Sequence, residues 1–161
     1  MSNITCIGID PGGSGAMAII KGDKIKTIPF SKKAYDQELR KYKGLGLEKV
    51  RCVLELVHSM PGQGVKSTFS FGRNFGYIIG LLEANDIKYS LVSPISWKTY
   101  YHLIGKGKQA SIDLVHQKFP KANLKRTNRK DNDDHNIAEA VLFADYAKHL
   151  SIEDFHVKSQ L

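Results

Sequence analysis

Residues 7–15 read Ile-Gly-Ile-Asp-Pro-Gly-Gly-Ser-Gly, a sequence that predicts the end of a strand and a turn. The apolar run 4–9 is typical of a buried strand, and Asp10 closes it. The Asp-Pro dipeptide and the glycines that follow it favour a turn. Because further strands are expected at 16–20 and 24–28, with a Gly-Asp turn between them, we predict an antiparallel meander of three strands.

The rest of the chain alternates between helix and strand patterns. Strands are expected at 51–57 and 88–92, and the first of them is apolar enough to be a central strand buried on both faces. Helices are expected at 32–43, which is polar and therefore predicted to be exposed, at 66–84, from Ser93-Pro94 onward, at 109–119 and at 133–149. This order predicts one α/β domain over 1–161, a five-stranded mixed sheet flanked by helices.

Composition narrows the class of protein. The chain has 161 residues, of which 42% are hydrophobic and 25% charged, as in ordinary globular domains. The apolar runs are too short to span a bilayer, and residues 1–6 lack the pattern of a secretory signal, so we expect a cytoplasmic protein without a membrane segment. Cys6 and Cys52 lie in apolar stretches and are predicted to be reduced core residues.

Charge indicates the kind of partner. The chain carries 24 Lys and Arg against 16 Asp and Glu, a net charge of +8. A soluble basic protein needs no special partner, but this excess favours a polyanion, and nucleic acid before membrane.

Three carboxylates lie inside hydrophobic elements: Asp10, Glu55 and Glu139. Burying an unpaired carboxylate is costly, so each needs a partner or a metal. If the strands that carry Asp10 and Glu55 are neighbours, the final helix can bring Glu139 to the same edge. Mg²⁺ prefers such oxygen ligands, and two such ions can clamp the attacking and leaving oxygens of a phosphodiester. A turn former at Asp10, a salt bridge at Glu55 and a solvated Glu139 are the alternatives.

The start of the final helix offers further candidates. His135 is four residues before Glu139, so the two side chains lie about 40° apart on one helix face. Asp134 reaches that face only if it precedes the first regular turn. Capping of the helix N-terminus is the alternative for Asp134, as it is for Asp131 and Asp133.

Gly72, Gly76 and Gly80 recur at every fourth position of the helix expected at 66–84. Each glycine costs a helix about 1 kcal/mol relative to alanine, so three on one face require a reason. Close backbone approach, to the sheet or to a second subunit, supplies one.

Taken together, these residues resemble the RuvC-type Holliday junction resolvases, in particular the short phage-type members of that RNase H-like family. The resemblance is carried by residues 7–15, by 53–75 with its Met-Pro-Gly-Gln-Gly and Phe-Gly-Arg segments, by 93–98, and by 134–140. It covers nearly the whole chain and is weakest from Thr27 to Val50.

The resemblance implies an endonuclease of recombination and repair that acts as a homodimer. It would make paired nicks across a four-way DNA junction with Mg²⁺ or Mn²⁺, in a bacterial or virus-infected cell. Asp10, Glu55 and Glu139 would hold two ions per site, with His135 as the fourth ligand and Asp134 as its alternative. Lys98 and Lys108 match basic residues that the family places at the active site, and the glycine-bearing helix matches the dimer helix.

The sequence departs from the family at two positions. Glu139 stands where many members have Asp, and His58 stands where bacterial members carry an aromatic residue. Contacts to DNA are expected from exposed side chains, and a solvated loop is the alternative for the basic cluster at 125–130. The candidates are His58, Lys66, Arg73, Lys106, Lys125, Arg126, Arg129 and Lys130.

Two other functions share these sequence features in whole or in part. A nuclease of the same fold that also cuts forks and flaps has the same sequence features. A junction-binding protein without catalysis would not need all three carboxylates.

Overall fold

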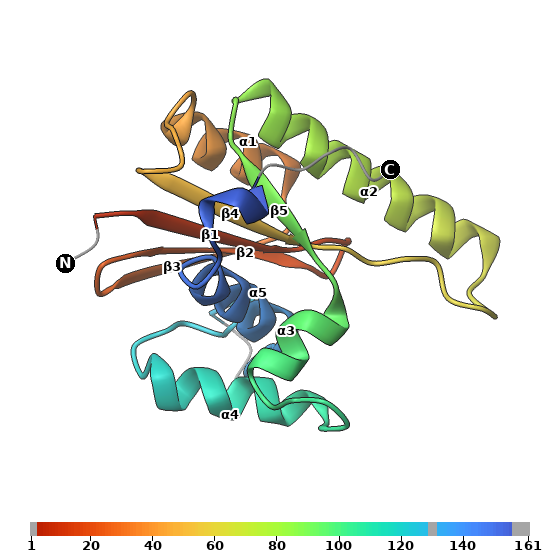
Figure 1. The fold of residues 1–161 in the computed structure, drawn as a ribbon. Helices are drawn as coiled ribbons and strands as arrows, with labels where there is room; N and C mark the ends of the chain where they lie inside the picture. The colour runs from red at the N-terminus through yellow and green to blue at the C-terminus, as the bar shows by residue number, and fades with distance from the viewer. Residues whose placement is uncertain (1–2, 129–131, 156–161) are drawn as a thin grey trace.

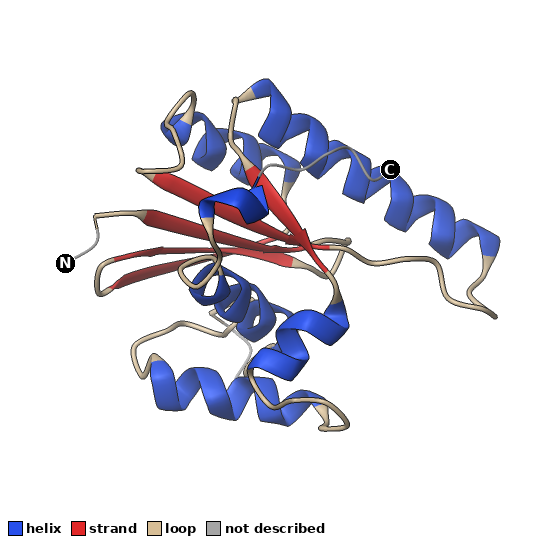
Figure 2. Cartoon of the chain, viewed as in Figure 1, coloured by secondary structure: helices blue, strands red, loops and turns tan. Residues whose placement is uncertain are grey.

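The computed structural model describes residues 3–128 and 132–155, and it contains a five-stranded mixed sheet (Figures 1 and 2). The strand order is β3-β2-β1-β4-β5. β1 pairs antiparallel with β2 and parallel with β4, so the predicted meander is confirmed and extended by two parallel strands. The strands are β1 (Thr5–Asp10), β2 (Ala16–Lys21), β3 (Lys24–Pro29), β4 (Val50–Glu55) and β5 (Tyr89–Val92).

Helices cover both faces of the sheet. α1 and α2 pack on one face, and α3, α4 and α5 lie on the other, which divides the core into two layers (Figure 1). The helices are α1 (Lys32–Leu39), α2 (Val65–Ala84), α3 (Pro94–Tyr100), α4 (Lys108–Lys118) and α5 (His135–Tyr146), with short 3-10 turns η1 (Arg40–Tyr42) and η2 (Ile152–Phe155). No helix in the described ranges is both long and apolar enough to cross a bilayer.

β4 is the central strand that its apolar sequence predicts, with the interior residues Cys52, Val53 and Leu54 fully buried. It ends at Glu55 rather than at the predicted residue 57. Its last backbone link to β5 follows directly, from Leu56 N–H to the Val92 carbonyl. Glu55 therefore closes its strand as Asp10 closes β1.

α5 packs directly on β1 because β1 carries a glycine at the crossing. A Cβ on Gly8 would collide with the backbone carbonyl of Ala140 and the backbone nitrogen of Ala144. This backbone-to-backbone approach requires glycine and fixes the height of α5 above the strand. α5 begins at His135, two residues later than predicted, because the Asp134 side chain caps it.

One sequence prediction about helices is wrong, and one of the two alternatives for the glycines of the helix at 66–84 is excluded. The helix at 32–43 was expected to be exposed, but Tyr35 and Leu39 of α1 are 0% exposed and pack against the sheet. The sheet was one possible reason for the glycines of α2, but Gly72, Gly76 and Gly80 are exposed, and a Cβ on each would meet open space. α2 packs instead through its opposite face, which includes Phe75 and Ile78.

Both cysteines are free and buried, as predicted. Cys6 belongs to the core layer under α5, and Cys52 to the layer under α1 and α2.

Candidate active site

Asp10 and Glu55 stand side by side at one edge of the sheet. The parallel register pairs Ile9 with Leu54, so these carboxylates occupy the next position on each strand. Side chains alternate along a strand, and Gly8 and Val53 face α5, so Asp10 and Glu55 face α5 too. The two residues are 8% and 9% exposed. Burial, followed by the charges of Glu55, Glu139 and Asp134, raises the pKa of Asp10 well above its usual value.

Glu139 comes from the second turn of α5, the helix that crosses β1 at Gly8. Burial, reinforced by the negative charge of Glu55, raises its pKa to about 7, while Lys98 and Lys108 act in the opposite direction. The charges of Glu55 and Glu139 both raise the pKa of Asp10, and the charge of Glu55 raises that of Glu139, so the carboxyl groups of β1, β4 and α5 lie near one another. The sequence predicts that these carboxylates lie at one edge, and their role as metal ligands stays a prediction.

Glu55 is oriented by Trp97 of α3. The indole N–H donates a 2.6 Å hydrogen bond to Oε2 of Glu55, and Trp97 is 0% exposed. Burial raises the pKa of Glu55, although this hydrogen bond and the Lys98 charge lower it. α3 begins where β5 ends, with the Ser93 hydroxyl accepting a hydrogen bond from the Ser96 N–H. The helix start therefore sets the position of Trp97 beside the β4 carboxylate.

The predicted lysines, Lys98 and Lys108, border the acidic cluster, the name used here for Asp10, Glu55 and Glu139. Lys98 is partly buried, and its Nζ lies 5.3 Å from the centre of the Trp97 ring. Lys108 is the exposed first residue of α4, and its charge lowers the pKa of both Glu139 and His135. The two lysines thus act on the carboxylates through their charge, and within the described residues neither forms an ion pair with them.

Asp134 and His135 differ in whether their side chains are available to bind a metal ion. Asp134 Oδ1 accepts from the backbone N–H groups of Asn136 and Ile137, and its Oδ2 accepts from Arg126. Both oxygens are therefore engaged, as the capping alternative predicts. His135 begins the helix, and burial together with Lys108 lowers its pKa, which leaves a neutral imidazole able to bind a metal.

The donor chemistry fits a hard divalent cation. No ion pair in residues 3–128 and 132–155 involves Asp10, Glu55 or Glu139, although all three are largely buried. Burying like charges together without a cation is unfavourable, and oxygen donors are those that Mg²⁺ prefers. Within the described residues, however, no three His, Cys, Asp or Glu side chains are grouped closely enough to form a ready metal site.

The predicted DNA contacts divide into three groups. His58, Lys66, Arg73 and Lys106 are exposed, as is Lys125. Arg126 is partly buried and bonded within the protein. Arg129 and Lys130 lie outside the described residues.

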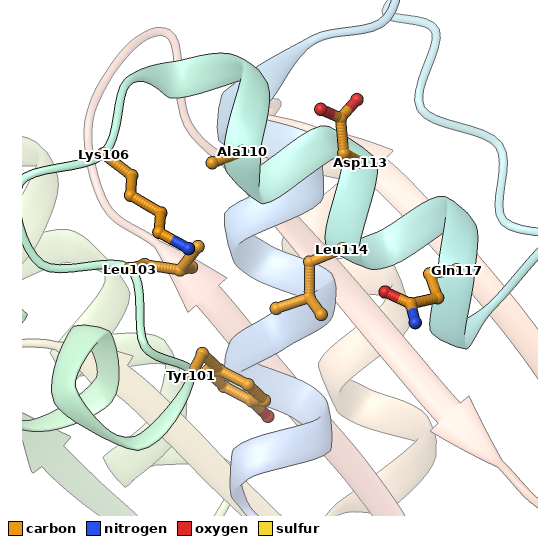
Figure 3. A pocket seen from close by; sticks show the side chains of 7 residues that line it. All are labelled: Tyr101, Leu103, Lys106, Ala110, Asp113, Leu114 and Gln117. Atoms are coloured by element: carbon orange, nitrogen blue, oxygen red, sulfur yellow. The ribbon is translucent and has the colours of Figure 1, made fainter.

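Lys106 also lines a pocket of about 290 Å³ between the loop after α3 and one face of α4 (Figure 3). The other lining residues are Tyr101, Leu103, Ala110, Asp113, Leu114 and Gln117. None of the four carboxylates discussed above lines this pocket, so it is separate from the acidic cluster.

Sequence reasoning missed two contributors to the site. Trp97 is the one tryptophan of the chain and directly precedes the candidate Lys98, which is a usable signal. The bonds of Arg126 to the carbonyls of Ser14 and Gly15 span more than 100 positions of sequence, and local pattern does not predict such contacts.

Comparison with known proteins identifies the fold. No family model and no curated protein sequence matches the chain. A solved structure of Thermus thermophilus RuvC matches with a TM-score of 0.57 at 12% identity, over 88% of this chain and 91% of that chain. The fold is RNase H-like. A second structure, T. thermophilus RuvC in complex with a Holliday junction substrate, matches with a TM-score of 0.54 at 11% identity, over 88% and 90% of the two chains. At such low identity the likeness extends to the RNase H-like fold and no further.

Proposed function

We propose that the protein is a metal-dependent endodeoxyribonuclease that resolves four-way DNA junctions by paired phosphodiester hydrolysis. The observation that carries this proposal is the placement of Asp10 and Glu55 at adjacent ends of β1 and β4, facing the helix α5 that carries Glu139. The charges of Glu55 and Glu139 raise the pKa of Asp10, which supports their proximity. The RNase H-like fold, and the junction bound to one of the structures that share it, support the choice of substrate.

The residues have separate roles. Asp10, Glu55, Glu139 and His135 would hold the cations, Mg²⁺ or Mn²⁺. A bound divalent ion supplies Lewis-acid chemistry, lowering the pKa of an attacking water and stabilising the leaving oxygen. Trp97 fixes the Glu55 carboxylate through its indole N–H. Lys98 and Lys108 offset negative charge that builds up on the phosphate during hydrolysis.

Two such sites would be brought together by α2. Val65, Phe69, Gly72, Gly76 and Gly80 lie within a sector of about 80° on the helix surface. This stripe faces solvent, with Val65 88% and Phe69 72% exposed. A second copy of the chain would bury it, and the bare glycines would let the two helices approach closely. The resulting homodimer would present one acidic cluster to each of two strands.

Binding of DNA would rest on the net charge of +8 and on the exposed basic side chains. Contacts from Lys66, Arg73 and Lys106 to phosphates fix the position of DNA without reading its sequence. Selectivity for branched DNA would then come from the spacing of the two sites.

The test uses a synthetic four-way junction with linear duplex and replication-fork controls, in Mg²⁺ and in EDTA. We expect symmetric nicks on the junction alone, lost in EDTA. Asp10→Asn should abolish cutting while the mobility shift of the bound junction persists.

Two results would replace this function by another. Comparable cutting of forks would assign a broader branched-DNA nuclease. Binding without cutting, in Mg²⁺ and Mn²⁺ alike, would assign a structural junction binder.

A further inference from the structure

Arg126 joins the two ends of the acidic cluster. Its Nε donates to Oδ2 of Asp134 at 2.8 Å, and its Nη2 donates to the Ser14 carbonyl at 2.6 Å. Its Nη1 reaches the Gly15 carbonyl at 3.5 Å. One guanidinium thus connects the turn that follows Asp10 with the N-cap of α5.

The turn held by Arg126 is itself tightly folded against Asp10. A Cβ on Gly15 would collide with the backbone carbonyl of Asp10, so only glycine allows this approach. The Gly15 N–H donates to the Gly12 carbonyl at 3.2 Å, and the Gly15 carbonyl accepts from the Phe30 N–H at 3.1 Å. A shift of this turn therefore moves the end of β1 that carries Asp10.

Arg126 and its partners Asp134, Ser14 and Gly15 are called the clamp below. Its Asp134 end is also bonded to its surroundings. Asp134 caps α5 through its Oδ1, at 2.9 Å from the Asn136 nitrogen. Its own N–H donates to the Leu124 carbonyl at 2.7 Å. His135 and Glu139 lie in the first two turns of α5, so the Asp134 cap anchors the part of the helix that carries them, ahead of the crossing at Gly8.

The clamp is sheltered from water. The side chains of Arg126 and Asp134 are only 20% and 21% exposed. A planar guanidinium can hold a carboxylate and two carbonyls at once, whereas a lysine ammonium is a single point donor. The engaged donors make Arg126 poorly placed to contact a DNA phosphate.

We propose that Arg126 is a positioning residue, which sets the spacing between Asp10 and the carboxylate and imidazole of α5. This inference rests on the proposed nuclease function. It also removes Arg126 from the set of DNA contacts that the basic cluster at 125–130 suggests.

The experiment compares Arg126→Lys and Arg126→Ala with Lys121→Ala, an exposed charge removed from the same loop. Junction affinity is measured by fluorescence anisotropy at several salt concentrations, and cleavage by single-turnover kinetics at saturating protein. We expect Arg126→Lys to cut about 10-fold to 100-fold more slowly, as for outer residues that orient metal ligands. Its affinity and salt dependence should stay within about twofold of the wild type, since its charge is kept.

Asp134→Asn breaks the same ion pair from the other side while keeping Oδ1 for the helix cap. If the clamp acts as a unit, Asp134→Asn, Arg126→Lys and the double variant all lose a similar factor in rate, because their effects are not additive. Thermal unfolding of each variant shows whether it is folded under the assay conditions.

A second readout does not depend on cleavage. The rise in unfolding temperature caused by Mn²⁺ should be smaller for Arg126→Lys than for wild type and unchanged for Lys121→Ala. If the wild type binds Mn²⁺ but cuts no DNA, the proposed function fails while the Mn²⁺ comparison still tests Arg126.

The inference is overturned if Arg126→Lys retains the wild-type rate and Mn²⁺ response. It is also overturned if Arg126→Ala weakens junction binding with a shallower salt dependence and an unchanged saturating rate.

Discussion

Trp97 donates its indole N–H to Oε2 of Glu55 at 2.6 Å, across 42 positions of sequence and within the buried layer beneath α5. The ring also packs edge-to-face against Phe143 of α5, with centroids 5.1 Å apart. One side chain therefore contacts the carboxylate of β4 and the helix that carries Glu139. Trp97 therefore serves both the core and the candidate site, and only a variant that keeps a ring in the core separates the two roles.

Trp97→Phe keeps an aromatic ring in the core but removes the donor to Glu55. We expect the Mg²⁺ concentration needed for half-maximal cleavage to rise about 10-fold, because an outer residue no longer orients a metal ligand. Tyr101→Phe is the matched control, since the Tyr101 hydroxyl bonds Asp145 and the Leu142 carbonyl instead of a cluster carboxylate. An equal Mg²⁺ requirement in the two variants would refute a specific role for Trp97.

Glu139 predicts a dependence of stability on pH. Its pKa is raised from 4.5 to about 7, so the folded state binds its proton more tightly than the unfolded state. The contribution of protonated Glu139 to the free energy of unfolding is therefore complete below pH 4.5 and is lost as pH rises through 7. Glu139→Gln should remove this loss and stabilise the protein on the order of 2 kcal/mol at pH 8 relative to wild type, measured by urea unfolding.

The comparison between wild type and Glu139→Gln isolates this effect from carboxylates whose pKa is lowered by folding and whose contribution to stability therefore changes with pH in the opposite direction. Although burial acts against it, bonds to Lys26 and Lys41 lower the pKa of Glu38, whose contribution is lost as pH falls. That contribution is common to both proteins and cancels in the difference. A difference that is constant from pH 4 to pH 8 would show that Glu139 titrates normally.

Tyr35 and Tyr42 provide a matched pair of hydroxyl groups. Tyr35 Oη is the one buried side-chain polar atom in the described part of the chain that has no hydrogen-bond partner. Tyr42 Oη donates to Oε1 of Glu38 at 3.1 Å. We expect Tyr42→Phe to lower the free energy of unfolding by about 1 kcal/mol and Tyr35→Phe to leave it unchanged or raise it. Chemical denaturation of both variants checks this, and a larger loss in Tyr35→Phe would reveal a partner for that hydroxyl.

The sequence predicted the sheet because local signals and tertiary structure agree there. The apolar run before Asp10, the Gly22 turn and the apolar residues of β4 each specify their elements locally. Convergence of Asp10 and Glu55 followed from strand adjacency alone. These predictions needed only alternation along strands and the placement of parallel strand ends.

Contacts between distant segments could not be predicted in this way. The polar composition of 32–43 hid the buried face made by Tyr35 and Leu39, because two apolar side chains suffice to anchor a short helix. The charge of Arg126 gave no indication that its partners would be Asp134 and the carbonyls after Asp10. Such bonds depend on the final approach of loops, which local pattern does not encode.

The exposed glycines of α2 destabilise the helix relative to alanine and make no compensating contact within one chain. A Cβ on Gly76 meets nothing within 4 Å. In an isolated chain, Gly76→Ala should therefore stabilise α2 by about 1 kcal/mol.

If two copies pack through the exposed stripe of α2, a larger side chain separates the two helices. Gly76→Leu should then shift the protein from dimer to monomer in sedimentation equilibrium, while circular dichroism shows that the chain stays folded. Gly107→Leu is the control, since Gly107 is also exposed in open space but precedes α4. A wild type that sediments as a monomer at all concentrations, or a Gly76→Leu variant that remains a dimer, would rule out α2 as the subunit contact and leave the glycines without a structural reason.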